Sequence, residues 1–126
     1  MTRLGGPARL VLVDPHTVVR HSPRALLEDE GIRVVGDVGT DAEARDVVLE
    51  QRPDVVVVDQ HLDGGTGLDL CRLLSRTTPC VVCVLHVSTL TAKLEHEARS
   101  AGVTHLVLKS LKDSHLASVV RAAAAN

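Results

Sequence analysis

The stretch VVVVDQHLDGGTG, residues 55–67, decides the fold, because four consecutive valines run directly into Asp59. Four or more β-branched residues without polar alternation are typical of a central parallel strand that is covered on both faces. Parallel α/β sheets place their chemistry at the carboxyl ends of the strands. The pattern therefore predicts that the carboxylate of Asp59 emerges at the edge of the sheet where a functional site is expected.

Strand-like and helix-like segments alternate on both sides of this stretch. Apolar segments that predict strands lie near residues 9–14, 32–38, 55–59, 80–85 and 103–108, and segments of helical period separate them. Five parallel strands with right-handed helical connections predict an α/β fold of the flavodoxin-like, doubly wound type. We expect a five-stranded parallel sheet in the order 2-1-3-4-5, with helices on both faces.

Capping residues mark the expected helix boundaries. Thr40 with Glu43 three residues later is a capping box for the second helix, and Gly31 and Gly102 stand where helices should end. Pro23 falls inside the segment of the first helix, which predicts either a kink or a helix start with this proline in the first turn.

Size and composition limit the function of the chain. Its 126 residues suit one domain spanning 1–126, and a net charge of −2 with scattered Lys and Arg gives no footprint for nucleic acid. The first apolar run, residues 10–13, is too short for a signal or a membrane span, so we expect a cytoplasmic protein without membrane contact. The absence of Phe, Trp and Tyr removes any stacking platform for bases or flavins.

The three cysteines are interpreted as small apolar residues in a reduced compartment. Cys80 and Cys83 lie three apart in a predicted strand, so their side chains should point to opposite faces. This spacing argues against a disulfide or a zinc knuckle between them.

Polar residues gather at the carboxyl edge of the predicted sheet. They are Asp14, Pro15 and His16 after the first strand, Asp59 and His61 at the third, His86 at the fourth and Lys109 at the fifth. Segments 12–16, 53–67 and 101–109, with Asp14, Asp59 and Lys109 at matching spacing, resemble the receiver domain of bacterial two-component response regulators, particularly the NarL/FixJ type. The resemblance covers nearly the whole chain.

This resemblance implies a role for several residues. Asp59 matches the aspartate that accepts a phosphoryl group from a histidine kinase, and Lys109 matches the lysine that pairs with the phosphate. Asp14 matches the first of two acids that hold Mg²⁺, and His61 matches the residue whose backbone carbonyl is a further ligand. The implied chemistry is metal-assisted phosphoryl transfer to a carboxylate.

Four positions depart from the family pattern. Pro15 replaces the second acid, so we expect the Mg²⁺ site formed by Asp14, Asp59 and His61 to be weak and assign no firm cofactor. His86 replaces a small hydroxyl residue and Leu106 replaces an aromatic residue, so both switch positions are degenerate. Asp63 replaces a proline in the following loop.

The leading hypothesis is an atypical receiver domain that works without phosphorylation as an interaction module and not as an enzyme. It would control homodimerisation of a DNA-binding transcriptional regulator, through the fourth and fifth helices or the first and fifth. DNA would be bound only by a helix-turn-helix output domain outside this chain. In this hypothesis Asp59 pairs with Lys109 for structure alone.

Two alternatives remain open. The first is a conventional Mg²⁺-dependent receiver that a histidine kinase phosphorylates on Asp59. The second is a transition-metal or pH-sensing domain that uses His61 and His86, together with His16, because imidazole and carboxylate suit such metals. In the pH-sensing version, the charged form of His86 would be favoured beside two acids.

Overall fold

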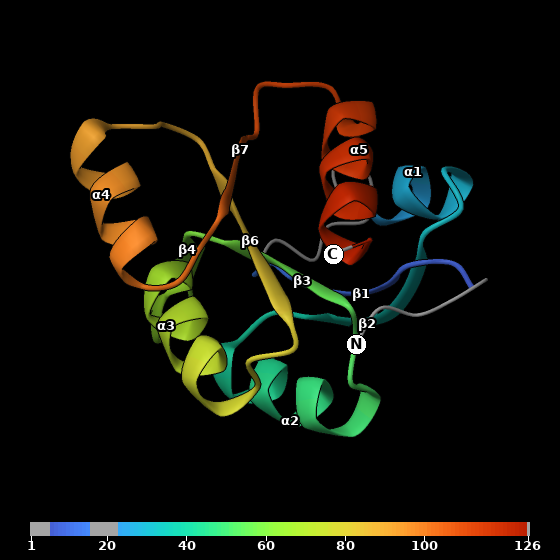
Figure 1. Cartoon of the computed structure of the whole chain (residues 1–126), viewed down its shortest axis with the longest axis horizontal. Coiled ribbons are helices and arrows are strands. Elements are labelled where there is room, and N and C mark those ends of the chain that lie inside the picture. The colour runs from blue at the N-terminus through green and yellow to red at the C-terminus, as the bar shows by residue number, and fades with distance from the viewer. Residues whose placement is uncertain (1–5, 16–22, 126) are drawn as a thin grey trace.

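A five-stranded parallel sheet forms the centre of the protein (Figure 1). The computed structural model describes residues 6–15 and 23–125. In spatial order the strands are β2 (Arg33–Val38), β1 (Arg9–Val13), β3 (Val55–Asp59), β6 (Val82–Val87) and β7 (His105–Leu108). A separate hairpin consists of β4 (His61–Leu62) and β5 (Gly65–Thr66). With the hairpin set aside, the predicted order 2-1-3-4-5 is confirmed.

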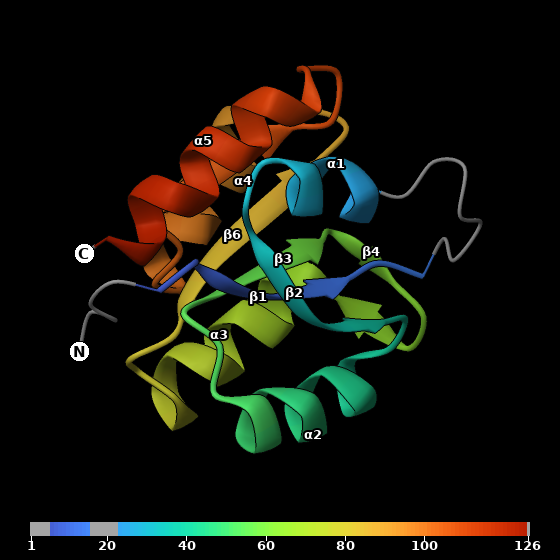
Figure 2. The ribbon, with the colours of Figure 1, turned by 90° about the vertical axis from the view of Figure 1, so that its right-hand side faces the viewer.

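Helices cover both faces of this sheet, as predicted (Figure 2). The helices α1 (Arg24–Asp29) and α5 (Asp113–Ala124) lie together on one face. The opposite face is covered by α2 (Asp41–Gln51), α3 (Gly67–Thr77) and α4 (Ala92–Ser100). The carboxyl ends of β1, β3, β6 and β7 therefore meet at one edge between two helical layers.

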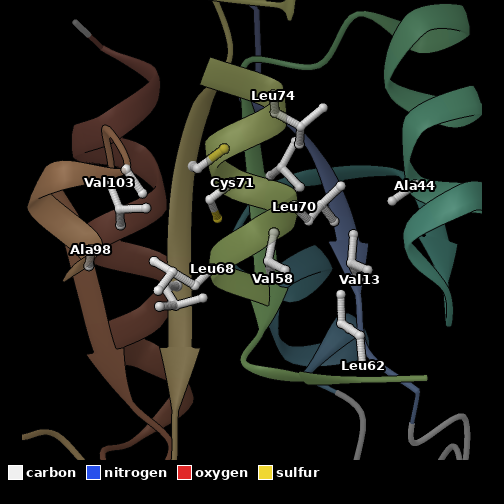
Figure 3. Close-up of a cluster of buried hydrophobic side chains, with 14 of the residues drawn as sticks. Val13, Ala44, Val58, Leu62, Leu68, Leu70, Cys71, Leu74, Ala98 and Val103 are labelled. Atoms are coloured by element: carbon white, nitrogen blue, oxygen red, sulfur yellow. The ribbon is translucent and has the colours of Figure 1, made fainter. Parts of the chain in front are cut away.

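Alternate residues of β3 supply the cores on the two faces. Val56 and Val58 pack with the α2, α3 and α4 side, part of which Figure 3 shows, whereas Val55 and Val57 pack with the α1 and α5 side. All residues of β3 are buried, including Asp59. The interpretation of the valine run as a strand covered on both faces is therefore confirmed.

The predicted capping residues also act as expected. The hydroxyl of Thr40 accepts a hydrogen bond of 3.2 Å from the backbone N–H of Glu43 at the start of α2. Gly31 and Gly102 have φ angles of 85° and 88°, in the left-handed region that glycine adopts without steric strain. The first helix begins at Arg24, with Pro23 at its N-cap, and the residues just before Pro23 lie outside the described part of the chain.

The fourth predicted strand is displaced along the chain. It was expected at residues 80–85, but β6 spans Val82–Val87. The reason is a turn after α3, in which the N–H of Val81 donates to the carbonyl of Thr78 at 3.0 Å. Cys80 therefore lies before the strand and is exposed, so the prediction that it belongs to this strand was wrong. His86, in contrast, lies within the strand.

Across residues 6–15 and 23–125, no helix combines the length and the apolar character that a membrane span requires.

Candidate functional site

Asp59 and Lys109 form a tight ion pair at the carboxyl edge of the sheet. The Nζ atom of Lys109 lies 2.6 Å from Oδ2 of Asp59, whose side chain is only 3 % exposed. The other carboxylate oxygen, Oδ1, accepts a hydrogen bond of 3.1 Å from the backbone N–H of His61. Lys109 is itself fixed, because its backbone N–H donates to the carbonyl of Val87 at 2.7 Å. The predicted meeting of Asp59 and Lys109 is confirmed.

Asp14 and Pro15 stand at the same edge, directly after β1. The N–H of Asp14 donates to the carbonyl of Val38 at 2.9 Å, which holds this turn against β2. Val13 is in register with Val58, so Asp14 lies level with Asp59 along the sheet. Pro15 is half-buried and its side chain offers no oxygen ligand. His16, the third residue predicted in this turn, lies outside the described residues.

A further carboxylate that the sequence analysis missed, Asp37, joins the site from β2. Burial is the main factor that raises its pKa, the charge of Asp14 adds to the effect, and Arg24 opposes it. The guanidinium of Arg24 in α1 lies 3.7 Å from the carboxylate of Asp37. The signal available in the sequence was an acid near the end of a mostly apolar strand, which the predicted strand order placed beside the first strand.

His86 extends the site toward β6, because it is in register with Asp59 on the neighbouring strand. Burial lowers the pKa of His86, and the positive charge of Lys109 lowers it further, while Asp59, Asp14 and Asp113 act in the opposite direction. The expectation that a charged imidazolium would be favoured was therefore wrong. The sequence showed that acids would lie near His86, but it did not show how deeply the His86 ring is buried or how close it lies to Lys109.

His61 presents its side chain to solvent and contributes to the site through its backbone. Residues 61–66 form the hairpin β4–β5, and α3 begins directly after it at Gly67. The hairpin turns at Gly64, whose φ is 87°. The hydroxyl of Thr66 caps α3 by accepting from the N–H of Asp69 at 3.1 Å.

Gly67 and Gln60 fix the start of α3 against the end of β3. A Cβ atom on Gly67 would lie 2.3 Å from the carbonyl oxygen of Asp59, so only glycine fits. The carbonyl of Gln60 accepts from the N–H of Gly67 at 2.9 Å, and its side-chain Oε1 accepts from the N–H of Leu68 at 3.0 Å. The position of α3 is thus tied to the backbone of Asp59.

The donors at this edge fit Mg²⁺ poorly. Mg²⁺ requires near-octahedral oxygen coordination and is usually held by one or two carboxylates besides water and phosphate. Asp59 is engaged by Lys109 and by the N–H of His61, and Pro15 adds no side-chain oxygen. In the described part of the chain, no three side chains of His, Cys, Asp or Glu are grouped so that they could hold a metal. The histidine hypothesis for a transition metal therefore gains no support there.

Leu106, predicted as the second switch position, is partly buried on β7, in register with Leu85. With Leu90, Arg99 and Thr104 it lines an open hollow of about 530 Å³ beside α4. Its side chain has no polar group that could answer a change at Asp59.

The model of the response regulator receiver domain family matches residues 10–121. The chain belongs to this family. The DNA-binding transcriptional activator DevR/DosR of Mycobacterium tuberculosis is 38% identical over 114 residues, which are 90% of this chain and 52% of that protein. A protein-glutamate methylesterase/protein-glutamine glutaminase of Hahella chejuensis is 30% identical over 108 residues, which are 84% of this chain and 31% of that protein.

Among solved structures, a two-component response regulator of the LuxR family from Aurantimonas sp. superimposes on this receiver domain with a TM-score of 0.88. The two are 29% identical, and the match covers 95% of this chain and 86% of that one. The receiver domain spans about half the length of DevR/DosR and less than a third of the methylesterase.

Proposed function

We propose that this receiver domain is the signalling and interaction module of a transcriptional regulator and that it works without phosphorylation of Asp59. The observation that carries the proposal is the state of the acceptor position. Asp59 is buried and held by Lys109, while Pro15 stands beside Asp14 where a second acid would bind a metal. In this proposal the ion pair between Asp59 and Lys109 has a structural role, and the domain is not an enzyme.

The charges around Asp59 support a domain that works without phosphorylation. Phosphoryl transfer to a carboxylate needs a divalent cation to neutralise charge on the transferring group. When bound, Mg²⁺ would supply that charge next to Asp14 and Asp59. Lys109 already lies at 2.6 Å from Asp59, and a proline in place of a carboxylate removes one negative charge from the pocket. The remaining residues favour the ammonium of Lys109 over a metal ion.

The route from the acceptor to the surface is altered as well. His86 is a half-buried ring whose pKa is lowered by burial, so it is held as a neutral side chain next to Asp59. An imidazole is bulkier than a small hydroxyl side chain, so we infer that it moves less freely at this position. Leu106 ends in methyl groups that pack against the core. These two residues support a domain whose conformation does not depend on a phosphate.

The output of the domain is proposed from its relatives. DevR/DosR is a DNA-binding transcriptional activator, and the Aurantimonas protein belongs to the LuxR family of response regulators. We infer that this chain likewise controls a regulator that binds DNA through a separate output domain, as a homodimer in a cytoplasmic signalling pathway. The proposed contacts are α4, β7 and α5, or α1 and α5.

A phosphorylation assay tests the proposal. The domain is incubated with Mg²⁺ and acetyl phosphate, and its intact mass is measured. We expect no phosphoryl adduct on the wild type and a clear adduct on a Pro15→Asp, His86→Thr double variant, which restores the acid and the small hydroxyl. A stoichiometric adduct on the wild type that disappears in Asp59→Asn would establish the conventional mechanism instead, with a histidine kinase as the phosphoryl donor in the cell.

A second measurement addresses dimerisation. Analytical ultracentrifugation of the wild type and of Asp59→Asn should give the same association constant, since the proposal makes assembly independent of a charged acceptor. A dimer that forms only after treatment with acetyl phosphate would contradict phosphorylation-independent control.

A further inference from the structure

The hairpin formed by β4 and β5 connects the first turns of two helices. Near its turn, Asp63 pairs in an isolated parallel bridge with Thr40, which is the N-cap residue of α2. At its end, Thr66 is the N-cap residue of α3. Between these two points, Leu62 is buried in the same core cluster as Val13 (Figure 3). The position of the hairpin therefore affects the starts of both α2 and α3.

The carboxylate of Asp59 holds the beginning of this hairpin. Its Oδ1 atom accepts a hydrogen bond of 3.1 Å from the backbone N–H of His61, and its Oδ2 atom accepts one of 2.6 Å from Nζ of Lys109. The two oxygens of one side chain thus bind a backbone group of the hairpin and an ammonium group that follows β7. Because the side chain of Asp59 is only 3 % exposed, water is a poor substitute for either donor.

We propose that Asp59 is a positioning residue for the β4–β5 hairpin, so that a change at Asp59 is passed through the hairpin to the starts of α2 and α3. The physical basis is the number of acceptor atoms. A carboxylate has two acceptor oxygens, whereas a side-chain amide has one oxygen and an NH₂ group that only donates. In the geometry of this site, an amide at position 59 cannot accept from both Lys109 and His61.

The two donors differ in strength, which determines where the single oxygen of an amide turns. Hydrogen bonds from a charged group are roughly twice as strong as those between neutral groups. In Asp59→Asn, the oxygen should therefore face the ammonium of Lys109, and the NH₂ group should face the N–H of His61. Two donors would then oppose each other, and the hairpin would lose its anchor although a polar side chain of the same size remains.

This route leads away from the two degenerate switch positions. His86 and Leu106 lie on β6 and β7, on one side of β3, whereas the hairpin reaches α2, which packs on β1 and β2 on the other side. The proposed dimer contacts on α1, α4, β7 and α5 do not include this region. The hairpin route involves no metal and no phosphoryl group, so it does not rest on the proposed absence of phosphorylation.

Amide hydrogen exchange, measured by NMR on the wild type and on Asp59→Asn, tests the proposal. The exchange of each N–H is compared with that of Val57 in the centre of β3, which separates local opening from a change in the stability of the whole domain. Relative to Val57, the N–H of His61 should exchange about tenfold faster in Asp59→Asn, because it loses a hydrogen bond to a charged group.

The helix caps report whether the change travels beyond the hairpin. The N–H of Glu43 donates to the hydroxyl of Thr40 at the start of α2, and its exchange should also become faster. The N–H of Leu94 is the matched control, because it donates to the hydroxyl of Thr91 in the same kind of cap at the start of α4. Its exchange should stay unchanged.

Two double variants decide whether the acceptor count is responsible. Adding Lys109→Met to Asp59→Asn removes the competing donor, so the amide oxygen can turn to the N–H of His61 and slow exchange should return. Asp59→Ala with Lys109→Met has no acceptor, so exchange should stay fast. Neither double variant contains the buried carboxylate or its ammonium partner, and circular dichroism verifies that both are folded.

Three results would overturn the proposal. The first is that Asp59→Asn leaves the exchange of His61 unchanged relative to Val57. The second is that the two double variants exchange equally fast at His61. The third is that Leu94 becomes faster by the same factor as His61, which would indicate a general loosening of the domain. All measurements are made without a phosphoryl donor, so they can fail or succeed independently of the acetyl phosphate assay.

Discussion

Replacement of Lys109 by methionine should lower the stability of the domain substantially. Removing one partner of a buried ion pair costs about 3–5 kcal/mol, because the remaining charge stays in a poorly solvated place. Asp59 is 3 % exposed at its side chain, whereas Lys109 is 30 % exposed, so water screens part of the interaction. We therefore expect Lys109→Met to lower the free energy of unfolding by roughly 2–3 kcal/mol.

The double variant Asp59→Asn, Lys109→Met isolates the interaction between the two side chains. An asparagine carries no charge that needs a cation, so the double variant should be more stable than Lys109→Met alone. The coupling energy from this cycle should be about 1–3 kcal/mol, as for residues in direct contact. A value near zero would mean that the short distance between Nζ and Oδ2 contributes nothing measurable.

Urea unfolding followed by far-UV circular dichroism is the suitable assay, because the chain contains no Trp or Tyr that could report by fluorescence. A loss of this size should move the urea midpoint down by about 1–2 M. Lys112→Met is the matched control, since Lys112 is an exposed lysine close in sequence whose replacement should leave the midpoint nearly unchanged. Equal midpoints for Lys109→Met and Lys112→Met would refute the structural role of the pair.

Three further predictions test other parts of the site. Gly67→Ala should destabilise the domain by about 2–4 kcal/mol, because its Cβ would lie 2.3 Å from the carbonyl oxygen of Asp59, whereas Gly65→Ala has room and should change the urea midpoint little. Because the pKa of His86 is lowered in the fold, its contribution to stability is complete above the ordinary pKa of 6.5 and is lost as the pH falls through the pKa of the folded state. We therefore expect His86→Gln to lose less stability than the wild type on acidification, as measured by thermal unfolding. The raised pKa of Asp37 means that the fold favours the protonated carboxyl group. At neutral pH, Asp37→Asn should therefore be more stable than the wild type, by less than about 1 kcal/mol after solvent screening. Chemical denaturation should show that this advantage vanishes below pH 3.8, the ordinary pKa of the group.

Local sequence patterns were sufficient to predict the frame of the site. The run Val55–Asp59 predicted a strand buried on both faces, and the structure has all of it buried. Since parallel strands bring their carboxyl ends to one edge, Asp59 and Lys109 could be placed together although they lie 50 positions apart. The capping residues Thr40, Gly31 and Gly102 were found for the same reason, because helix ends depend on neighbours in the chain.

Strand boundaries and surroundings were harder to predict. The apolar segment around Cys80 could not show that a turn would delay β6 until Val82, and this delay exposes Cys80 and places His86 opposite Asp59. Asp37 was overlooked although the strand order placed β2 beside β1, because the sequence does not show which charged groups will lie near a single acid in a strand.

By itself, then, the sequence determined the alternating elements, the order of the sheet and the residues at its carboxyl edge, because periodicity and capping act between residues close in the chain. Only the tertiary structure decided the protonation preference of His86, which depends on depth and on the distance to Lys109. The energy of this group comes from partners distant in sequence, whose positions are set when helices pack on the sheet.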